Sequence, residues 1–396
     1  MSRDDKMMYH ASSRIKRYQQ RVTELGAGGS LTQRKSVYLK CFAEAYEAYQ
    51  KSAAQQVLSD CDAIELVSEH TQWMDDWIRF TWWYVVQEYP YLMEEMLKTS
   101  AQKRPYLIKT IPRKRKKSDE ISGLLSQQDE QQMAIDPAER AYYSNLLKDL
   151  EKEITELEQE KKLLDEIDSS ANLERIDEDH LLSVFSLFAR GGYGRGELTF
   201  SSDVDLGYCL DPEKAEGFDI LSLQELIKRM EELFQETPLD LASQYFELHE
   251  DLTRFSRIDM LHTIPSILEG RAVLGSEAVL VTLKQQFLNT CPQEKAIRYL
   301  NDQIASLEFK SNDILYVKNG FGGLRHLQYL FWMILILDDC RFSNSGILLD
   351  YLQKKGWIST NDQKTLQRTL EFYFDVRNFI GLYDQYTEEI AQVDYE

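Results

Sequence analysis

The stretch FSLFARGGYGRGELTFSSDVDLGYCL, residues 185–210, decides the fold that the sequence predicts. It begins within an apolar run, residues 184–189, which is short enough to be a buried strand. A turn rich in glycine follows, and after it comes the segment Ser-Ser-Asp-Val-Asp-Leu. At strand period, Asp203 and Asp205 project from one face while the apolar residues beside them face the core. The stretch therefore predicts a strand, a glycine turn and a second strand with two carboxylates on one face.

Two carboxylates on the same face of a strand repel each other, and a divalent cation removes that penalty. Mg²⁺ is commonly held by one or two carboxylates together with the phosphates of a substrate. In the turn, Gly191 and Gly192 let backbone N–H groups approach a triphosphate, and Arg195 can neutralise it. The alternative reading is an ordinary glycine turn followed by a strand with exposed aspartates.

Ten residues, Tyr193 to Ser202, separate the Gly-Gly pair from Asp203. This order resembles the signature of nucleotidyltransferases of the DNA polymerase β-like superfamily. The local wording, GGYGRGEL followed by SSDVDL, more narrowly resembles the catalytic domains of protein-PII uridylyltransferases and glutamine-synthetase adenylyltransferases. The resemblance implies an α+β fold, in which a small mixed-sheet nucleotidyltransferase domain is flanked by N-terminal and C-terminal helical regions.

In the resembled families a third Asp or Glu sits on a strand after a helix, which the apolar spacing predicts here over 221–234. Asp240, in a Leu-Asp-Leu triplet, is the candidate by order and context, and Glu247 is the reserve. Two Mg²⁺ ions roughly 3.5–4 Å apart need more ligands than two carboxylates give. The alternative is that Asp240 is an ordinary solvent-facing aspartate on a strand.

A second matching element lies at residues 317–332, VKNGFGGLRHLQYLFW. Its Lys-x-Gly-x-Gly-Gly-Leu-Arg core, Lys318 to Arg325, resembles an element that follows the nucleotidyltransferase domain in both families. Glycines before a helix expose N–H groups, and the two cations suit phosphate or base contacts. The alternative is a helix-connecting turn with two surface cations. The families usually have an acid after that arginine, whereas this chain has His326.

The candidate site residues fall into two groups. Asp203, Asp205 and Asp240 are the predicted catalytic residues and metal ligands, and the predicted nucleotide-binding residues are Gly191, Gly192, Arg195, Ser202, Lys318 and Arg325. Arg377 is of a type that can reach back to the site, but no motif supports it.

The pattern along the chain predicts five regions. Residues 1–100 read as an N-terminal helical module, with a helix opening at Ser30 and an aromatic stripe that is either a recognition face or, as we favour, the buried side of a helix ending near Pro90. The other regions are a basic and polar linker over 101–135, a long helix or short coiled coil over 136–170, the nucleotidyltransferase domain over 180–256 and a C-terminal domain over 257–396 that is helical to its end.

The run KRPYLIKTIPRKRKK, residues 103–117, is the one strongly basic stretch. It is either a contact for nucleic acid or an acidic partner, or a solvated loop whose charge balances a neighbouring acidic face. We favour the loop, because no aromatic platform accompanies the charges.

The net charge of −20 argues against a surface that binds nucleic acid or an anionic membrane. Five scattered cysteines without a C-x-x-C pair predict neither a zinc site nor a disulfide framework. With no signal-like N-terminus and no long apolar stretch, the sequence predicts a reduced, cytoplasmic protein.

Together with the resemblance, these observations predict a Mg²⁺-dependent enzyme that moves UMP or AMP from an NTP to a protein hydroxyl, with release of pyrophosphate. The acceptor would be PII-like or glutamine-synthetase-like, and its hydroxyl a tyrosine. The alternatives are a nucleotide-binding regulatory module with weak or no catalysis, and transfer to RNA or a small molecule. A uridylyl-removing activity is not predicted, because no His-Asp pair of the phosphohydrolase kind follows. The choice between UTP and ATP, and the oligomeric state, stay open.

Overall fold

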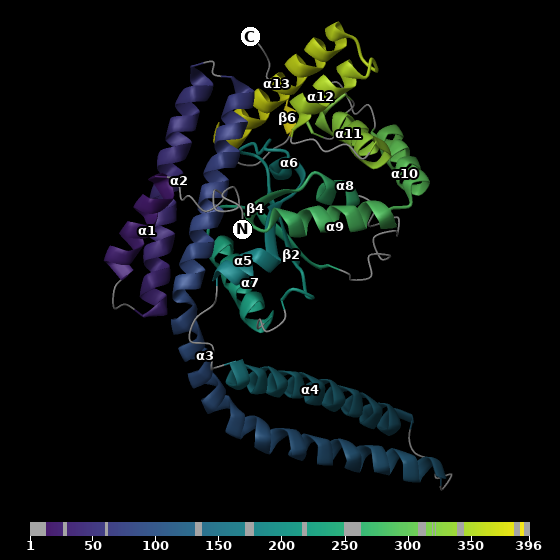
Figure 1. Ribbon diagram of the computed structural model, residues 1–396. Coiled ribbons are helices and arrows are strands. Elements are labelled where there is room, and N and C mark those ends of the chain that lie inside the picture. The colour runs from purple at the N-terminus through teal and green to yellow at the C-terminus, as the bar shows by residue number, and fades with distance from the viewer. Residues whose placement is uncertain are drawn as a thin grey trace. The chain divides into compact units, whose positions relative to one another are not determined.

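The computed structural model describes residues 13–26, 30–59, 62–130, 137–170, 178–215, 220–248, 263–307, 314–318, 320, 322–338, 344–383 and 389–391 (Figure 1). The chain divides into two compact units. The first unit combines residues 1–85 with residues 177–396, and the second spans residues 86–176.

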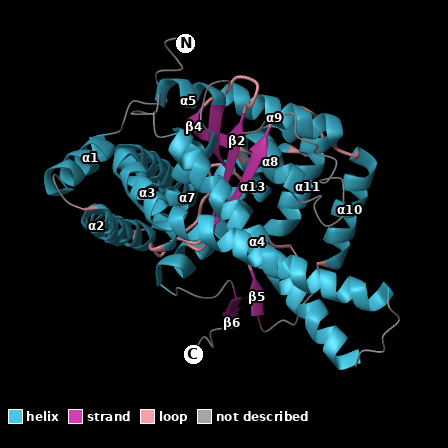
Figure 2. Ribbon diagram, turned by 90° about the horizontal axis from the view of Figure 1, so that it is seen from below, coloured by secondary structure: helices cyan, strands magenta, loops and turns pink. Residues whose placement is uncertain are grey.

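The centre of the first unit is a four-stranded mixed sheet, which Figure 2 shows among helices. The strand order is β3-β2-β1-β4, in which β1 pairs antiparallel with β2 and β4, and β2 pairs parallel with β3. The predicted α+β class with a small mixed sheet is confirmed. The strands are β1 (Phe185–Ala189), β2 (Val204–Leu210), β3 (Leu241–Glu247) and β4 (Arg271–Gly275).

Strand β4 corrects the expectation that residues 257–396 are helical to the end. Residues Ala272, Val273 and Leu274 are buried beside β1, and Ser276 N donates to Phe185 O at 2.8 Å just after the strand ends. Burial on both faces gives an unbroken apolar run, which a periodicity argument cannot separate from a helix. A two-stranded sheet of β5 (Ile314–Tyr316) and β6 (Glu389–Ala391) departs from the same expectation.

Short helices flank the sheet and prepare the site. In α7 the buried residues Leu223, Leu226 and Met230 recur at helical spacing, as the sequence predicts. The helix α9 contacts β1, β2 and β4, and its Leu283 and Phe287 join a buried cluster with Phe188. These helices are α5 (Glu178–Val184), α6 (Gly191–Gly194), α7 (Ile220–Gln235), α8 (Thr263–Leu268) and α9 (Glu277–Thr290).

The C-terminal helices share a core with the start of the third N-terminal helix. Leu349 and Phe374 from the C-terminal part pack in one cluster with Ala63 and Val67. These helices are α10 (Gln293–Ser306), α11 (Leu324–Asp338), α12 (Ser345–Lys354) and α13 (Thr360–Tyr383).

The N-terminal helices are α1 (Ser13–Gly26), α2 (Leu31–Leu58) and α3 (Ala63–Glu130). A capping box between Ser30 and Gln33 begins α2, in agreement with the sequence. The aromatic stripe consists of Trp73, Trp77, Phe80 and Tyr84, and all four are buried, which confirms the core interpretation over a recognition face. In it, Trp77 Nε1 donates to Tyr38 Oη at 3.1 Å.

The second unit corrects both the predicted linker over 101–135 and the predicted helix end near Pro90. Pro90, Pro105 and Pro112 all lie inside α3, which continues as a helix to Glu130. Each internal proline costs roughly 3 kcal/mol, and packing against α4 (Pro137–Ser170) offsets that cost. The apolar contact joins Leu107 and Ile111 to Leu164.

Ion pairs between α3 and α4 account for part of the basic run. Lys103, Lys114 and Arg115 pair with carboxylates of α4, and Arg104 pairs with Asp165. The run therefore does balance an acidic face, but as a helix instead of the predicted loop. The last residues of the predicted linker, 131–135, and Asp136, with which the predicted long helix begins, lie outside the described residues.

None of the helices in the described ranges has a stretch long and apolar enough to cross a membrane. Cys41, Cys209 and Cys291 are buried and form no disulfide among the described residues, whereas Cys61 and Cys340 lie outside those ranges.

Candidate active site

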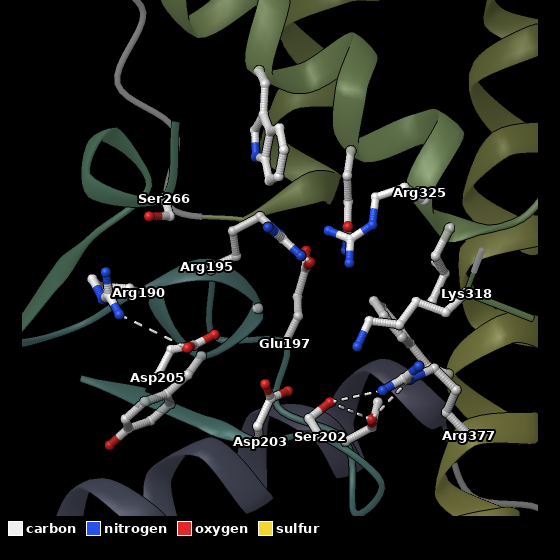
Figure 3. Close-up of a pocket in the computed structure, with 18 of the residues that line it drawn as sticks. Arg190, Arg195, Glu197, Ser202, Asp203, Asp205, Ser266, Lys318, Arg325 and Arg377 are labelled. Carbon is white, nitrogen blue, oxygen red and sulfur yellow. Dashed lines mark hydrogen bonds and ion pairs between the residues drawn. The ribbon is translucent and has the colours of Figure 1, made fainter. Parts of the chain in front are cut away.

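A cavity of about 310 Å³ opens beside the glycine turn. Its lining comes from the β1–β2 connection, from Gln244 of β3, from α8, from the segment around Lys318 and Arg325, and from α13 (Figure 3). Elements from distant parts of the chain therefore build one site, and all of them belong to the first unit.

The glycine turn packs against Asp205. Arg190 N donates to Asp205 O at 2.9 Å, and Gly194 N donates to Arg190 O at 2.8 Å, which closes the one-turn helix α6. Gly191 has a φ of +55°, and a Cβ there would lie 3.2 Å from Asp205 Oδ2. A side chain at this position would therefore be strained and would crowd the carboxylate.

Asp203 and Asp205 both line the cavity, as the strand pattern predicts, with Val204 and Leu206 buried behind them. Burial raises the pKa of Asp205, and the nearby charge of Asp203 raises it further. Arg190 and then Lys318 and Arg325 oppose that rise. Two carboxylates thus face cations across the cavity, a donor set that fits Mg²⁺ bound together with phosphate oxygens.

Arg195 is bound by two carboxylates within the protein. Its Nε donates to Glu197 Oε2 at 2.7 Å, and its Nη1 lies 2.8 Å from Glu269 Oε2. Burial would lower the pKa of Arg195, but Glu269 and Glu197 outweigh it and raise the pKa. The charge expected to neutralise a triphosphate is therefore already balanced inside the protein.

This buried group connects four parts of the fold. Glu269, between α8 and β4, accepts a hydrogen bond from Trp332 Nε1 of α11 at 2.8 Å. Glu197, in the β1–β2 connection, accepts one from Ser345 N at the start of α12 at 2.6 Å. Arg195 thereby holds the glycine turn against the C-terminal helices.

Arg377 of α13 does reach the site. Its Nε donates to Thr199 Oγ1 at 3.1 Å, and its Nη2 donates to Ser202 Oγ at 3.1 Å (Figure 3). The predicted nucleotide-binding residue Ser202 is thus positioned by a side chain from the far end of the chain. Gly381, one turn later, lets α13 approach closely, since a Cβ there would lie 2.4 Å from Phe200 C.

Lys318 and Arg325 both line the cavity, across from Asp203 and Asp205 in Figure 3. Arg325 N donates to Lys318 O at 2.9 Å, so the turn brings the two cationic residues together. Gly191 and Gly192 line the same cavity.

Asp240 lies elsewhere. It precedes β3, its backbone oxygen accepts from Val204 N at 2.7 Å, and its exposed side chain lines a neighbouring cavity. Gln244 lines the main cavity from β3 instead and accepts a hydrogen bond from Arg190 Nη1 at 2.8 Å. Among the described residues, no three His, Cys, Asp or Glu side chains gather closely enough to hold a metal ion.

The reserve candidate Glu247 does not join the site. It lies at the end of β3, and it accepts a hydrogen bond from Tyr245 Oη at 3.1 Å. Neither of the two cavities described here has it in its lining.

The N-terminal helices support the turn from behind. Asp75 of α3 accepts a hydrogen bond from Tyr193 Oη at 2.7 Å. It also accepts two from Arg271, from Nη1 at 2.7 Å and from Nη2 at 2.9 Å. The local sequence gives no sign of this role for Asp75, because nothing in its pattern distinguishes it from other helix aspartates.

Part of the chain that lines this cavity matches a known protein family. Residues 306–392 match the family model described as GlnD PII-uridylyltransferase, a range that contains the Lys318–Arg325 element and Arg377. The chain carries a PII uridylyltransferase-like region.

Curated relatives of this chain are named bifunctional uridylyltransferase/uridylyl-removing enzymes. The one from Methylococcus capsulatus is 27% identical over 222 residues, which is 53% of this chain and 23% of the relative. The one from Zymomonas mobilis is 26% identical over 239 residues, 56% of this chain and 24% of the relative. The chain thus spans about a quarter of the length of the relatives it matches.

One departure from the PII uridylyltransferase pattern has a structural reading. His326, where the families usually have an acid, accepts a hydrogen bond from Gly322 N through Nδ1 at 3.2 Å. A carboxylate oxygen accepts from a backbone N–H in the same way. The histidine therefore stabilises the turn that carries Lys318 and Arg325.

Proposed function

We propose that this chain transfers UMP from UTP to a tyrosine hydroxyl of a PII-like protein and releases pyrophosphate. The observation that carries the proposal is the cavity in which Asp203 and Asp205 face Lys318, Arg325 and Arg377. Carboxylates on one side and cations on the other suit a nucleoside triphosphate bound with its metal ions.

The reaction is a displacement at the α-phosphorus. A bond forms between the acceptor oxygen and phosphorus, the bond from phosphorus to the β-phosphate oxygen breaks, and pyrophosphate leaves. The proton of the hydroxyl passes to solvent. Such a transfer depends on positioning and on neutralising charge.

In this proposal Asp203 and Asp205 would hold Mg²⁺, expected as two ions, which would neutralise negative charge on the reacting phosphate. Lys318 and Arg325 contact the phosphates, and the Gly191–Gly192 backbone approaches them. Arg195 and Arg377 keep the turn and Ser202 in position, through the contacts with Glu197, Glu269 and Thr199.

The names of the relatives favour UTP over ATP and a PII protein over glutamine synthetase as the acceptor. Both choices belong to the proposal, because the aligned stretches cover 23% and 24% of those relatives.

The test is incubation with Mg²⁺, a purified PII protein and UTP or ATP labelled at the α-phosphate. We expect label on PII from UTP, and a loss of roughly a hundredfold or more in the Asp203→Asn/Asp205→Asn variant. The control is Asp119→Asn/Glu120→Gln, which removes the same formal charge from an exposed part of α3. Equal labelling by the paired-carboxylate variant and wild type would refute the proposal.

A second candidate is a nucleotide-binding module without turnover. The position of Asp240 outside the main cavity favours it, since a two-ion site commonly needs a third carboxylate. In the same assay this candidate predicts bound nucleotide and no labelled acceptor. Label on nucleic acid would support transfer to RNA instead.

A further inference from the structure

A second cavity, of about 690 Å³, meets the candidate active site at Ser202 and Asp203, which line both. Its walls come from α2, α3, the segment 200–204, the segment 238–240 and α13. Its volume is in the range of cavities that bind ligands of side-chain size or larger.

The two cavities differ in charge. The first is lined by five Arg and Lys residues, namely Arg190, Arg195, Lys318, Arg325 and Arg377, against three carboxylates, namely Glu197, Asp203 and Asp205. Among the described residues that line the second cavity, none is Lys or Arg, and three are carboxylates: Glu47, Asp203 and Asp240. A triphosphate therefore fits the first cavity and is repelled by the second.

Aromatic side chains form much of the second cavity. The rings of His70 and Phe200 stack with centroids 4.0 Å apart, and Phe42 and Tyr46 of α2 line the same space. Burial lowers the pKa of His70 to about 3, so the imidazole adds no positive charge near neutral pH. A cavity lined by both aromatic rings and carboxylates suits an aromatic ring that bears a hydroxyl.

We infer that this second cavity receives the acceptor tyrosine. The inference rests on the proposed function and names its acceptor site. In a displacement at phosphorus, the attacking oxygen and the leaving pyrophosphate lie roughly in line on opposite sides of the phosphorus. The acceptor must therefore adjoin the metal-binding carboxylates without occupying the cationic cavity, and only the shared wall at Ser202 and Asp203 offers that among the cavities described here.

The inference gives Asp240 a different role from the one that the family resemblance implies. It lines the acceptor cavity together with Asp203, and both side chains are exposed. The phenolic O–H of the acceptor donates to Asp240, which orients its oxygen toward the α-phosphorus. As the oxygen–phosphorus bond forms and pyrophosphate leaves, the phenolic proton passes to solvent.

The test fills the cavity without touching the nucleotide site. Ala43 and Ala48 are both exposed on α2, but only Ala43 lines the cavity. Ala43→Trp should lower kcat/KM for purified PII protein about tenfold or more, mainly through KM, while the Kd for UTP with Mg²⁺ changes less than about twofold. Ala48→Trp, with the same substitution on the same helix, should behave as wild type in both measurements.

A second variant separates the two roles of Asp240. Asp240→Asn should raise the KM for PII and leave the Kd for UTP with Mg²⁺ unchanged. A weakened Mg²⁺-dependent binding of UTP would instead make it a metal ligand and overturn its assignment to the acceptor.

The remaining outcomes test the acceptor cavity and the proposed function separately. Unchanged PII kinetics in Ala43→Trp, or equal losses in Ala43→Trp and Ala48→Trp, would overturn the acceptor cavity and leave the proposed function intact. Absence of transfer to PII by the wild-type protein would overturn both.

Discussion

At the scale of single residues, the fold places the carboxyl group of Asp205 where its ionisation costs free energy. Burial and the charge of Asp203 raise its pKa above the ordinary value of 3.8. The folded protein therefore keeps a proton on Asp205 at a pH where the unfolded chain has lost it. Linkage then requires that this group's contribution to stability is present below the ordinary pKa and is lost as pH rises through the raised one.

We predict that Asp205→Asn raises the midpoint of thermal unfolding at pH 7, because asparagine carries no charge to bury. The gain should shrink as pH falls and vanish below about pH 4, where the Asp205 side chain of the wild type is protonated and is as neutral as asparagine. Thermal unfolding across a pH series measures it. A midpoint below that of wild type at pH 7 would contradict the prediction.

Arg377 is a positioning residue at the same scale. Its truncation leaves Thr199 and Ser202 without their guanidinium donors, so Arg377→Ala should weaken UTP binding about tenfold and cost about 1–3 kcal/mol of stability. Arg377→Lys should recover part of the stability but less of the binding, since an ammonium cannot serve both oxygens with a fixed fork. Equilibrium binding and urea unfolding measure the two effects separately. Equal binding by all three proteins would contradict this role.

At the scale of elements, the contact between α13 and the 199–202 turn couples the C-terminal helix to the site. Asn378 Oδ1 accepts from Phe200 N at 3.4 Å, and Gly381 permits the close approach. At position 381, helix propensity therefore favours alanine, whereas the close packing favours glycine.

Gly381→Ala should destabilise the protein, although replacing glycine by alanine inside a helix normally stabilises by about 0.5–1 kcal/mol. The new Cβ would lie 2.4 and 2.5 Å from backbone atoms of Phe200 and Ser201. Gly123→Ala in α3 is the matched control, since a Cβ there meets nothing within 4 Å and should stabilise. Chemical denaturation of both variants measures the difference, and stabilisation at both sites would rule out the close contact.

At the scale of the whole molecule, the N-terminal helices up to residue 85 belong to the same compact unit as the sheet and the candidate site. Asp75 connects them through Tyr193 and Arg271. Asp75 is buried and Arg271 is half-buried, so removing the carboxylate leaves a guanidinium charge that water only partly solvates, which is destabilising.

Asp75→Asn should therefore cost about 3 kcal/mol and weaken UTP binding, because Tyr193 belongs to the glycine turn. Glu65→Gln, an exposed change at the start of the same helix, should stay within about 0.5 kcal/mol of wild type. Urea unfolding and equilibrium binding of UTP check both. An Asp75 variant as stable as the control would show that the pair does not hold the helices to the site.

The sequence by itself determined the parts that local patterns encode. The period of two in Asp203-Val204-Asp205-Leu206 identified β2 and the carboxylate face, because alternation along a strand follows from backbone geometry. The apolar spacing located α7, and the cap at Ser30 located the start of α2.

Only the tertiary structure decided which charged side chains are paired within the protein and which can contact a ligand. Arg195 pairs with Glu269, and Arg377 reaches Ser202, across long stretches of chain that no local pattern connects. The same holds for Asp240, whose place in a neighbouring cavity depends on where the parallel strand β3 begins. The continuous helix through Pro105 and Pro112 depends likewise on α4, since packing between distant segments can outweigh a local penalty of roughly 3 kcal/mol per proline.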